Sequence, residues 1–253
     1  MDLASMSHAT LIHCLVAMCD HIDDGSSWEK NGAYTCISTI PHSSMNGPIL
    51  ETAAVSAPAI REAIEKARAT GYPVSVLAPG DLTASQRAVL AEYGYTVEEE
   101  IPVMTASRPV DSPWPDELEL LDGPAAEAAH VDMVADVFSM DRSWIETMIN
   151  PDMYEFDDSY AVVGTLDGEP VTTGFALRRG SGAGVFNIAT TDGHRGKGYG
   201  AAATAAVTNH WFDRGITHAT LQSSDMGRSV YRRIGFRDVM THRRWSEPEV
   251  SEG

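Results

Sequence analysis

The sequence predicts a mixed α/β protein in which helices flank a central mixed sheet. Three observations predict this class: strand-like and helix-like patterns alternate along the 253 residues, a proline-rich stretch divides them, and the two halves repeat one order of elements. Apolar residues make up 43% and charged residues 21%, as in ordinary soluble globular proteins. The order of elements therefore carries more information than the composition.

The first half begins with an apolar helical stretch. No basic segment precedes it and acids follow at once, which favours an amphipathic helix over a signal peptide or membrane span. The expected elements are a helix over 7–19, strands over 34–40 and 48–53 joined by a turn at 45–47, a helix over 58–70, a strand over 74–77, a helix over 83–93 and a strand over 95–104.

A linker and a second domain follow. The stretch SRPVDSPWP carries three prolines, which is typical of a linker. The elements expected after it are a strand over 118–121, helices over 124–138 and 143–149, a hairpin over 160–177 with its turn at 167–168, strands over 185–190, 219–222 and 239–245, and helices after 200 and over 225–234. We therefore expect domains over 1–106 and 116–247, a linker over 107–115 and a disordered tail over 248–253.

The two halves share a spacing of glycines. When Gly71 is aligned with Gly215, the next glycine, Gly94 or Gly235, follows at a similar distance. This near-match suggests a duplicated fold whose first copy has diverged. The alternative is that two similar strand–helix units arose by chance.

Charge and cysteines limit the partners. A formal charge of −18 argues against a nucleic acid or an anionic membrane, although 11 of the 18 basic residues fall between Arg178 and Arg244, where an anionic ligand is expected. The three cysteines, Cys14, Cys19 and Cys36, have no metal-ligand spacing. We expect a reduced cytoplasmic protein without a metal site, with a homodimer as a possible assembly.

The segment RGKGYG, residues 195–200, lies at the start of an alanine-rich helix. Its three glycines leave backbone N–H groups uncovered, and the positive end of the helix dipole faces the same place. This arrangement suits a diphosphate. The sequence has neither the GK[ST] of a P-loop nor a GxGxxG that follows a strand with an acid downstream.

The segments around RGKGYG resemble the GNAT superfamily of N-acetyltransferases. RGKGYG matches the R/Q-x-x-G-x-G/A motif that binds acetyl-CoA, and SDMGRSVYRRIGF, residues 224–236, resembles the second signature, N/S-x-x-A/G-x-x-x-Y-x-x-x-GF. The strand over 185–190 lies where that family has its central splayed strand. The resemblance covers residues 118–245 and implies the GNAT acyl-CoA N-acyltransferase fold in two GNAT-like halves.

The resemblance implies roles for the matching residues, with acetyl-CoA as co-substrate. Tyr231 matches the general acid that protonates the leaving thiolate; the alternative is an ordinary core tyrosine. Ser224 replaces a frequent asparagine, or serves only as a helix cap. Backbone groups that would hold the pantetheine arm belong to Ile188, Ala189 and Thr190. Those that would hold the pyrophosphate belong to Arg195, Gly196, Lys197, Gly198, Tyr199, Gly200 and Ala201.

The first half lacks these features. Residues 52–60 read TAAVSAPAI, without an arginine or a series of glycines, and Leu90 occupies the position aligned with Tyr231. The first half is therefore expected to be a degenerate copy that serves as a scaffold or as a wall of the acceptor pocket.

The acceptor site is less defined. Direct attack of a neutral amine on the thioester requires a base, and neither Asn187 nor Thr190 can serve. Acids in the loop before the hairpin can reach an acceptor pocket and attract a cation, and their alternative role is that of solvated loop residues. These acids are Glu155, Asp157 and Asp158. His194 is a further candidate base, although its place in the phosphate loop favours contact with an anion.

These observations predict an acetyl-CoA-dependent N-acetyltransferase acting on a small amine, an amino-acid-like metabolite or an antibiotic. Cationic acceptors suit the acidic chain. A protein acetyltransferase acting on lysine or an N-terminus is the alternative enzyme. The intact RGKGYG and the acidity count against a transferase that uses aminoacyl-tRNA. From another class, the chain would bind acyl-CoA as a sensor without turnover.

Overall fold

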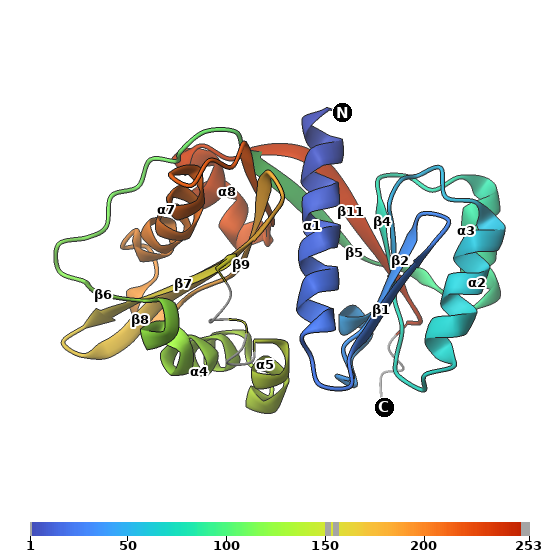
Figure 1. The fold of residues 1–253 in the computed structure, drawn as a ribbon, viewed down its shortest axis with the longest axis horizontal. Helices are drawn as coiled ribbons and strands as arrows, with labels where there is room; N and C mark the ends of the chain where they lie inside the picture. Colours follow the sequence, from blue (N-terminus) through green and yellow to red (C-terminus); the bar gives the residue numbers. More distant parts are fainter. Residues whose placement is uncertain (1, 150–152, 154–156, 249–253) are drawn as a thin grey trace. The chain divides into compact units, whose positions relative to one another are not determined.

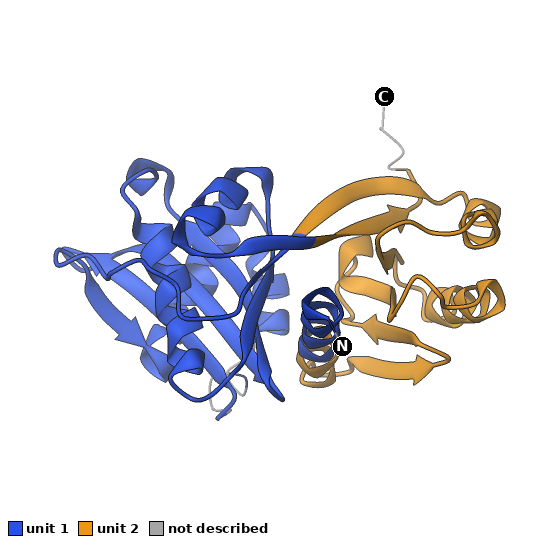
Figure 2. Ribbon diagram, turned by 90° about the horizontal axis from the view of Figure 1, so that it is seen from above, with its two compact units in different colours: residues 1–14, 103–239 blue, residues 15–102, 240–253 orange. Residues whose placement is uncertain are grey.

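The computed structural model describes residues 2–149, 153 and 157–248 and divides the chain into two compact units. Unit 1 comprises residues 1–14 and 103–239, and unit 2 comprises residues 15–102 and 240–253 (Figure 2). This division differs from the expected domains, because the first fourteen residues belong with the second half and the residues from 240 onward belong with the first half. Of the tail expected to be disordered, all but residue 248 lies outside the described residues.

Unit 1 is a mixed sheet with helices on both faces (Figure 1). Its strand order is β5-β10-β9-β8-β7-β6, and only the β9–β10 pair is parallel. Its strands are β6 (Glu119–Asp122), β7 (Ser159–Leu166), β8 (Glu169–Arg179), β9 (Gly182–Thr190) and β10 (His218–Gln222), with the end of β5 (Thr96–Ala106). Its helices are α4 (Glu127–Phe138), α5 (Arg142–Met148), α7 (Tyr199–Phe212) and α8 (Asp225–Ile234), with short 3-10 turns η2 (Gly123–Ala126) and η3 (Asp192–His194).

The hairpin between β7 and β8 forms at the predicted turn. Asp167 and Gly168 both have positive φ, 53° and 83°, which is the conformation of a two-residue type I′ turn. The register then places Ala161 opposite Phe175. Helix α7 packs on this sheet through small residues, among them Ala203 and Ala205, which let the helix approach closely.

Helix α1 (Leu3–Asp20) begins in unit 1 and ends in unit 2. In unit 1 it docks on the sheet through buried polar contacts: Ser7 Oγ lies 2.7 Å from Thr105 Oγ1, and Thr10 Oγ1 lies 2.9 Å from His218 Nε2. Among the described helices, α1 alone has the length and hydropathy to cross a membrane. Core helices meet the same criterion, and its hydrogen bonds to the sheet place α1 among them.

Unit 2 repeats the central part of this arrangement. Its strand order is β1-β2-β3-β4-β11, and helix α2 connects the parallel strands β3 and β4. Its elements are β1 (Ser26–Lys30), β2 (Ala33–Ile37), η1 (Ser43–Met45), β3 (Asn46–Leu50), α2 (Ala57–Arg68), β4 (Val76–Pro79), α3 (Ala84–Glu92) and the end of β11 (Arg237–Ser246). In each unit a strand, a crossover helix, a parallel strand and a second helix follow in order, as a duplication predicts.

The two halves of the chain exchange their last strands. Strand β5 leaves unit 2 and pairs antiparallel with β10 in unit 1, where Ala106 lies opposite Ala219. Strand β11 leaves unit 1 and pairs antiparallel with β4 in unit 2, where Arg244 lies opposite Leu77. This exchange explains why the unit boundaries differ from the linker at 107–115, although that stretch contains no helix or strand, as expected.

Strand β1 was missed in the sequence, where no element was expected between the helix over 7–19 and the strand over 34–40. The signal that could have found it is the dipeptide Asn31-Gly32, which joins β1 to β2. Both residues have positive φ, 54° and 80°, as the two central residues of a hairpin turn require. The first strand of unit 2 is therefore part of a hairpin.

The predicted turn at 45–47 extends too far, because strand β3 already begins at Asn46. The side-chain amide of Asn46 is buried and donates to the carbonyls of Ile40 and His42 at 2.8 and 2.9 Å. Asn46 therefore stabilises the loop before the strand through its side chain, while its backbone belongs to the sheet.

Gly47 tolerates no side chain. Its φ is 125°, and an added Cβ would lie 2.0 Å from the Ser75 carbonyl oxygen. We expect Gly47→Ala to lower the free energy of unfolding by about 2 kcal/mol or more, measured by urea denaturation. Gly193→Ala is the control, because a Cβ there meets no atom within 4 Å. Equal stability of the two variants would contradict the close approach at Gly47.

Candidate active site

Strands β9 and β10 pair only at their beginnings. The parallel register ends where Gly184 lies opposite Thr220, while β10 continues against β5 as far as Gln222. Beyond this point, no described strand pairs with the edge of β9 that faces away from β8. Unit 1 therefore has an open backbone edge in the middle of its sheet.

A bulge accompanies this opening. Thr173 of β8 lies opposite Ala189 of β9. Phe175, two residues further along β8, lies opposite Phe186, so β9 has one extra residue between these pairs. Asn187 adopts φ 53° there, a left-handed conformation that asparagine tolerates better than most residues. Because a bulge bends its strand, it directs the end of β9 away from β10.

The end of β9 leads into the uncapped start of helix α7. Gly198 is the N-cap with φ 89°, and no side chain bonds the first N–H groups of the helix. An added Cβ at Gly196 or Gly198 would meet no atom within 4 Å among the described residues, so this loop is open. The uncapped N–H groups and the positive end of the helix dipole together suit an anion.

Arg195 holds the loop to the end of β9. Its guanidinium pairs with the Asp192 carboxylate at 2.8 Å and donates to the Thr190 carbonyl at 3.2 Å. The side chain of Arg195 is 46% exposed, so one face of the guanidinium stays open to solvent. Positive charge is therefore available beside the start of α7.

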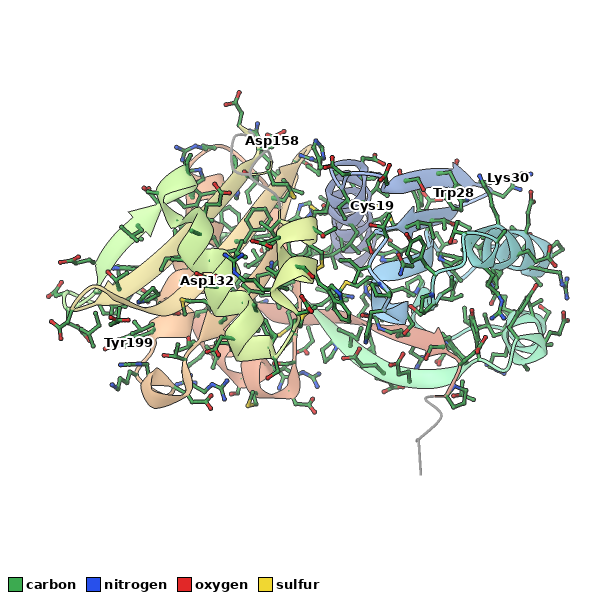
Figure 3. All side chains as sticks on the ribbon, turned by 90° about the horizontal axis from the view of Figure 1, so that it is seen from below. Cys19, Trp28, Lys30, Asp132, Asp158 and Tyr199 are labelled. Carbon is green, nitrogen blue, oxygen red and sulfur yellow. The ribbon has the colours of Figure 1, made fainter. Side chains whose placement is uncertain are left out.

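Tyr199 anchors the loop on its other side. Tyr199, labelled in Figure 3, is buried and donates to Glu117 at 3.1 Å, which attaches the loop to the segment before β6. The Lys197 ammonium lies 5.9 Å from the centre of the Tyr199 ring. The loop thus carries a second cation and has one attachment at each end.

Helix α8 carries Tyr231 on the same core as β9. Tyr231 and Ile188 are both half-buried against the cluster that contains Ala203 and Phe236. The Tyr231 ring also lies against Gly227, where an added Cβ would be 2.7 Å from Cε2 of the ring. Burial raises the pKa of the Tyr231 phenol to about 12, so the hydroxyl stays protonated at neutral pH.

Ser224 has the geometry of a helix cap. Its Oγ accepts the N–H of Gly227 at 3.2 Å, which satisfies one of the free donors at the start of α8. The capping role, one of the two alternatives for Ser224, is therefore present.

Of the predicted acidic residues, the structure describes Asp157 and Asp158. Glu155 lies outside the described residues, and Asp157 is exposed. Asp158, labelled in Figure 3, pairs with Arg178 at 2.5 Å and lies 3.6 Å from Arg179. Asp158 is thus held in an ion-pair network.

His194, the further candidate base, lies within the phosphate loop. Its Nδ1 is 3.0 Å from Thr191 Oγ1, and its ring stacks near Tyr199 with the ring centres 6.2 Å apart. This position beside the uncapped helix start is the one expected for contact with an anion.

His130 was not singled out from the sequence, where it is one more residue on an apolar helical face. It projects from α4, with Nδ1 2.5 Å from Thr173 Oγ1. The Thr173 hydroxyl donates to the Val162 carbonyl at 2.8 Å, so Nδ1–H is the donor to Thr173. Burial lowers the pKa of His130 to about 4 and keeps the ring neutral. His130 therefore bonds the strand residue next to Gly174, which lies opposite the bulge.

The corresponding loop of unit 2 is closed. The Gln86 amide donates to the carbonyls of Ala53 and Val55 at 2.9 and 2.6 Å and ties this loop to helix α3. Ser56 caps helix α2 by accepting an N–H of its first turn. The start of α2 is therefore satisfied within the unit, whereas the start of α7 is not.

Unit 2 also lacks the tyrosine. Leu90, at the position aligned with Tyr231, is fully buried in the core of unit 2. The open site of unit 1 thus has no counterpart in the described part of unit 2.

Comparison with known proteins finds one family model that matches part of the chain. A family model described as FR47-like protein matches residues 162–246, which include both RGKGYG and the Tyr231 segment. No functionally curated protein matches the sequence.

Solved structures match most of the chain. A GCN5-related N-acetyltransferase from Kribbella flavida has 21% identity and a TM-score of 0.76, over 98% of this chain and 96% of that one. One from Sphaerobacter thermophilus has 17% identity and a TM-score of 0.59, over 85% and 76%. A tandem GNAT protein from the clavulanic acid biosynthesis pathway has 10% identity and a TM-score of 0.59, over 95% and 94%.

The fold is therefore that of a GNAT-type acetyltransferase in tandem form. The family model covers residues 162–246 only, and the likeness over the rest of the chain is one of fold. The fold class predicted from the sequence is confirmed, and the matching solved structures have the GNAT fold that the resemblance implied.

The low pKa of His130 predicts how stability changes with pH. The folded state favours the neutral imidazole, so the contribution of His130 to the unfolding free energy is fully present above the ordinary histidine pKa of 6.5. This contribution is lost as the pH falls from 6.5 through about 4. Between pH 7 and pH 4 we expect the wild type to lose about 3 kcal/mol more unfolding free energy than His130→Gln. Urea denaturation at the two pH values measures the difference. Parallel losses in both proteins would contradict the neutral buried histidine.

Proposed function

We propose that this protein transfers the acetyl group of acetyl-CoA to the amine of a small metabolite, an amino-acid-like compound or an antibiotic. One observation carries the proposal: the open edge of β9 leads directly into the uncapped N-terminus of α7. An extended amide chain that ends in a diphosphate, as CoA has, fits these two features in order. The closed loop of unit 2 supports a single cofactor site per chain.

Backbone groups supply most of the proposed CoA contacts. The pantetheine arm pairs with Ile188, Ala189 and Thr190 as an added strand, because amides along the arm match the free edge. The pyrophosphate lies on the N–H groups of residues 195–201, with two basic side chains adding positive charge. Hydrogen bonds to backbone groups require little side-chain ordering, so such a site is preorganised.

The proposed reaction is direct transfer. The nitrogen of the neutral amine attacks the thioester carbonyl carbon, the proton on the new C–N nitrogen passes to water, and the tetrahedral intermediate collapses as the C–S bond breaks. Tyr231 gives its phenolic proton to the departing thiolate, and its raised pKa ensures that the proton is present. Solvent then reprotonates the phenolate. Positioning of the two substrates and polarisation of the carbonyl supply most of the rate enhancement.

The acceptor is proposed from charge. The chain carries a formal charge of −18, and Asp157 is exposed in the turn that leads into β7. A cationic amine is therefore attracted, and it must lose a proton before it attacks. Transfer to a lysine or an N-terminus, and CoA binding without turnover, are the alternatives that the experiment distinguishes.

The decisive experiment is a free-thiol release assay. Purified protein is mixed with acetyl-CoA and a panel of amines, amino acids, aminoglycosides and lysine-containing peptides, and CoA binding is measured separately by calorimetry. Acceleration by a small amine supports the proposal. Acceleration only by peptides indicates a protein acetyltransferase, and CoA binding without acceleration by any amine indicates a sensor.

Tyr231→Phe tests the general acid. We expect kcat to fall about a hundredfold while the dissociation constant for CoA stays within about twofold. Because the pKa of Tyr231 is about 12, the loss should be the same at pH 7 and pH 9. Tyr160→Phe is the matched control, since the pKa of that phenol is also raised to about 12 but its hydroxyl bonds Asp122. A comparable loss of kcat in the control would remove the special role of Tyr231.

Gly198→Ala tests the phosphate loop. An alanine at φ 89° is strained by about 1–2 kcal/mol, so the loop must distort, and CoA affinity should fall about tenfold in calorimetry. Gly215→Ala is the matched control, because Gly215 has φ 86° and equally open surroundings but lies after the other end of α7. This control carries the same strain and should change the affinity less than about twofold. Unchanged affinity in Gly198→Ala would show that CoA does not lie on this loop.

A further inference from the structure

The three cysteines have different surroundings. Cys14 belongs to unit 1, where it is fully buried and its thiol donates to the Leu177 carbonyl at 3.3 Å. Cys19 and Cys36 both belong to unit 2, and both are nearly buried, with exposed fractions of 3% and 8%. Cys19 lies at the end of α1 and is labelled in Figure 3. Only the last two cysteines are neighbours.

The Cys19 thiol lies on the backbone of strands β1 and β2. Its Sγ is 3.1 Å from the Ile37 carbonyl oxygen and 3.2 Å from that of Ser26, and these two residues are register partners. Cys36 directly precedes Ile37 in β2 and pairs with Ser27. The sulfur of Cys19 is therefore placed at the end of the strand pair that carries Cys36.

The Cys36 side chain points to the face of β2 that lies away from α2. Ala33 and Ile37 pack into the clusters that contain α2 residues, so strand alternation directs the side chain at 36 to the opposite face. There the two thiols are close enough to share a side-chain hydrogen bond. This bond lowers the pKa of Cys19 and raises the pKa of Cys36.

We propose that Cys19 and Cys36 form a reversible disulfide when the protein meets a hydroperoxide. The proposal rests on the adjacent buried thiols of unit 2 and is independent of the acetyltransferase function. The turn between α1 and β1 lies beside Cys19; its acids Asp23 and Asp24 are exposed, as is Asp20 at the end of α1. Local opening of this turn gives a small oxidant access to the sulfurs. Oxidation then links the end of α1 to β2 covalently.

The chemistry balances in two steps. The Cys19 sulfur attacks one oxygen of hydrogen peroxide and the O–O bond breaks; the other oxygen leaves with the thiol proton as water, and Cys19 becomes a sulfenic acid. The Cys36 sulfur then attacks the Cys19 sulfur, a second water leaves, and the S–S bond forms. The two thiols lose two electrons in total, and one peroxide gains them. A small thiol reductant reverses the reaction by exchange.

The experiment maps the disulfide in the Cys14→Ser chain. This variant is needed because trypsin leaves Cys14 and Cys19 on one peptide, residues 1–30, while Cys36 lies on residues 31–61. The folded protein is treated with a small excess of hydrogen peroxide, denatured in an alkylating agent and digested without reductant. We expect the two peptides to be joined, with a mass lower than their sum by two hydrogen atoms, and both alkylated peptides to be recovered after reduction.

Matched variants make the result specific. In the wild type, two of the three thiols should become inaccessible to alkylation, and oxidation should raise the midpoint of thermal unfolding, because the closed loop restricts the unfolded chain. Neither change should occur in Cys36→Ser, and Cys19→Ser should give no joined peptide.

Three outcomes would overturn the proposal. The first is that all thiols of the wild type can still be alkylated after oxidation. The second is that the two peptides are still joined in the Cys19→Ser variant, through Cys14. The third is that Cys19 is oxidised to sulfinic acid and no joined peptide forms. In each case Cys19 and Cys36 do not form the proposed reversible disulfide with each other.

Discussion

The early end of the β9–β10 pairing is the constraint on which the candidate site depends. Continued pairing beyond Gly184 would cover the backbone groups that the site requires, and an open edge at the border of the sheet would invite aggregation. The bulge at Asn187 resolves this conflict, because one extra residue turns β9 away while its other edge stays paired with β8. The open edge is thus internal to the sheet, with strands on both sides.

The open edge of β9 is followed by a helix that packs on the sheet through small residues. Helix α7 starts soon after β9 ends, and its alanines let it lie close to the sheet, with Ala203 fully buried. The uncapped start of the helix then stands beside the end of the open edge. In most helices a side-chain cap would satisfy these N–H groups. Gly198 supplies none, so a bound anion is the natural partner.

Unit 2 has a similar arrangement of strands and helices, but the start of its crossover helix is capped. It keeps the parallel strand pair and the crossover helix, but Ser56 caps helix α2 and Gln86 fills the loop before it. Each of these polar groups is satisfied within the unit, and Leu90 adds to the core where unit 1 has Tyr231. The start of α2 therefore has fewer unsatisfied donors than the start of α7, and satisfied buried donors favour stability.

Local chemistry could be predicted from the sequence, and long-range pairing could not. The Asp167-Gly168 turn, the cap at Ser224 and the glycines of the phosphate loop each depend on a few adjacent residues, and the structure has them at the predicted positions. The exchange of β5 and β11 depends on partners far away along the chain, which no local pattern encodes. The bond from His130 to Thr173 is missed for the same reason.

The strand exchange also limits how the two halves can be separated. A division at 107–115 would leave β10 without β5 and β4 without β11, and would expose one backbone edge in each sheet. It would also remove α1 from the sheet of unit 1, together with the buried bonds of Ser7 and Thr10. Each donor or acceptor left buried without its partner costs about 1–3 kcal/mol. The first half of the chain therefore completes the sheet that carries the candidate site, because β5 pairs with β10 and α1 packs on that sheet.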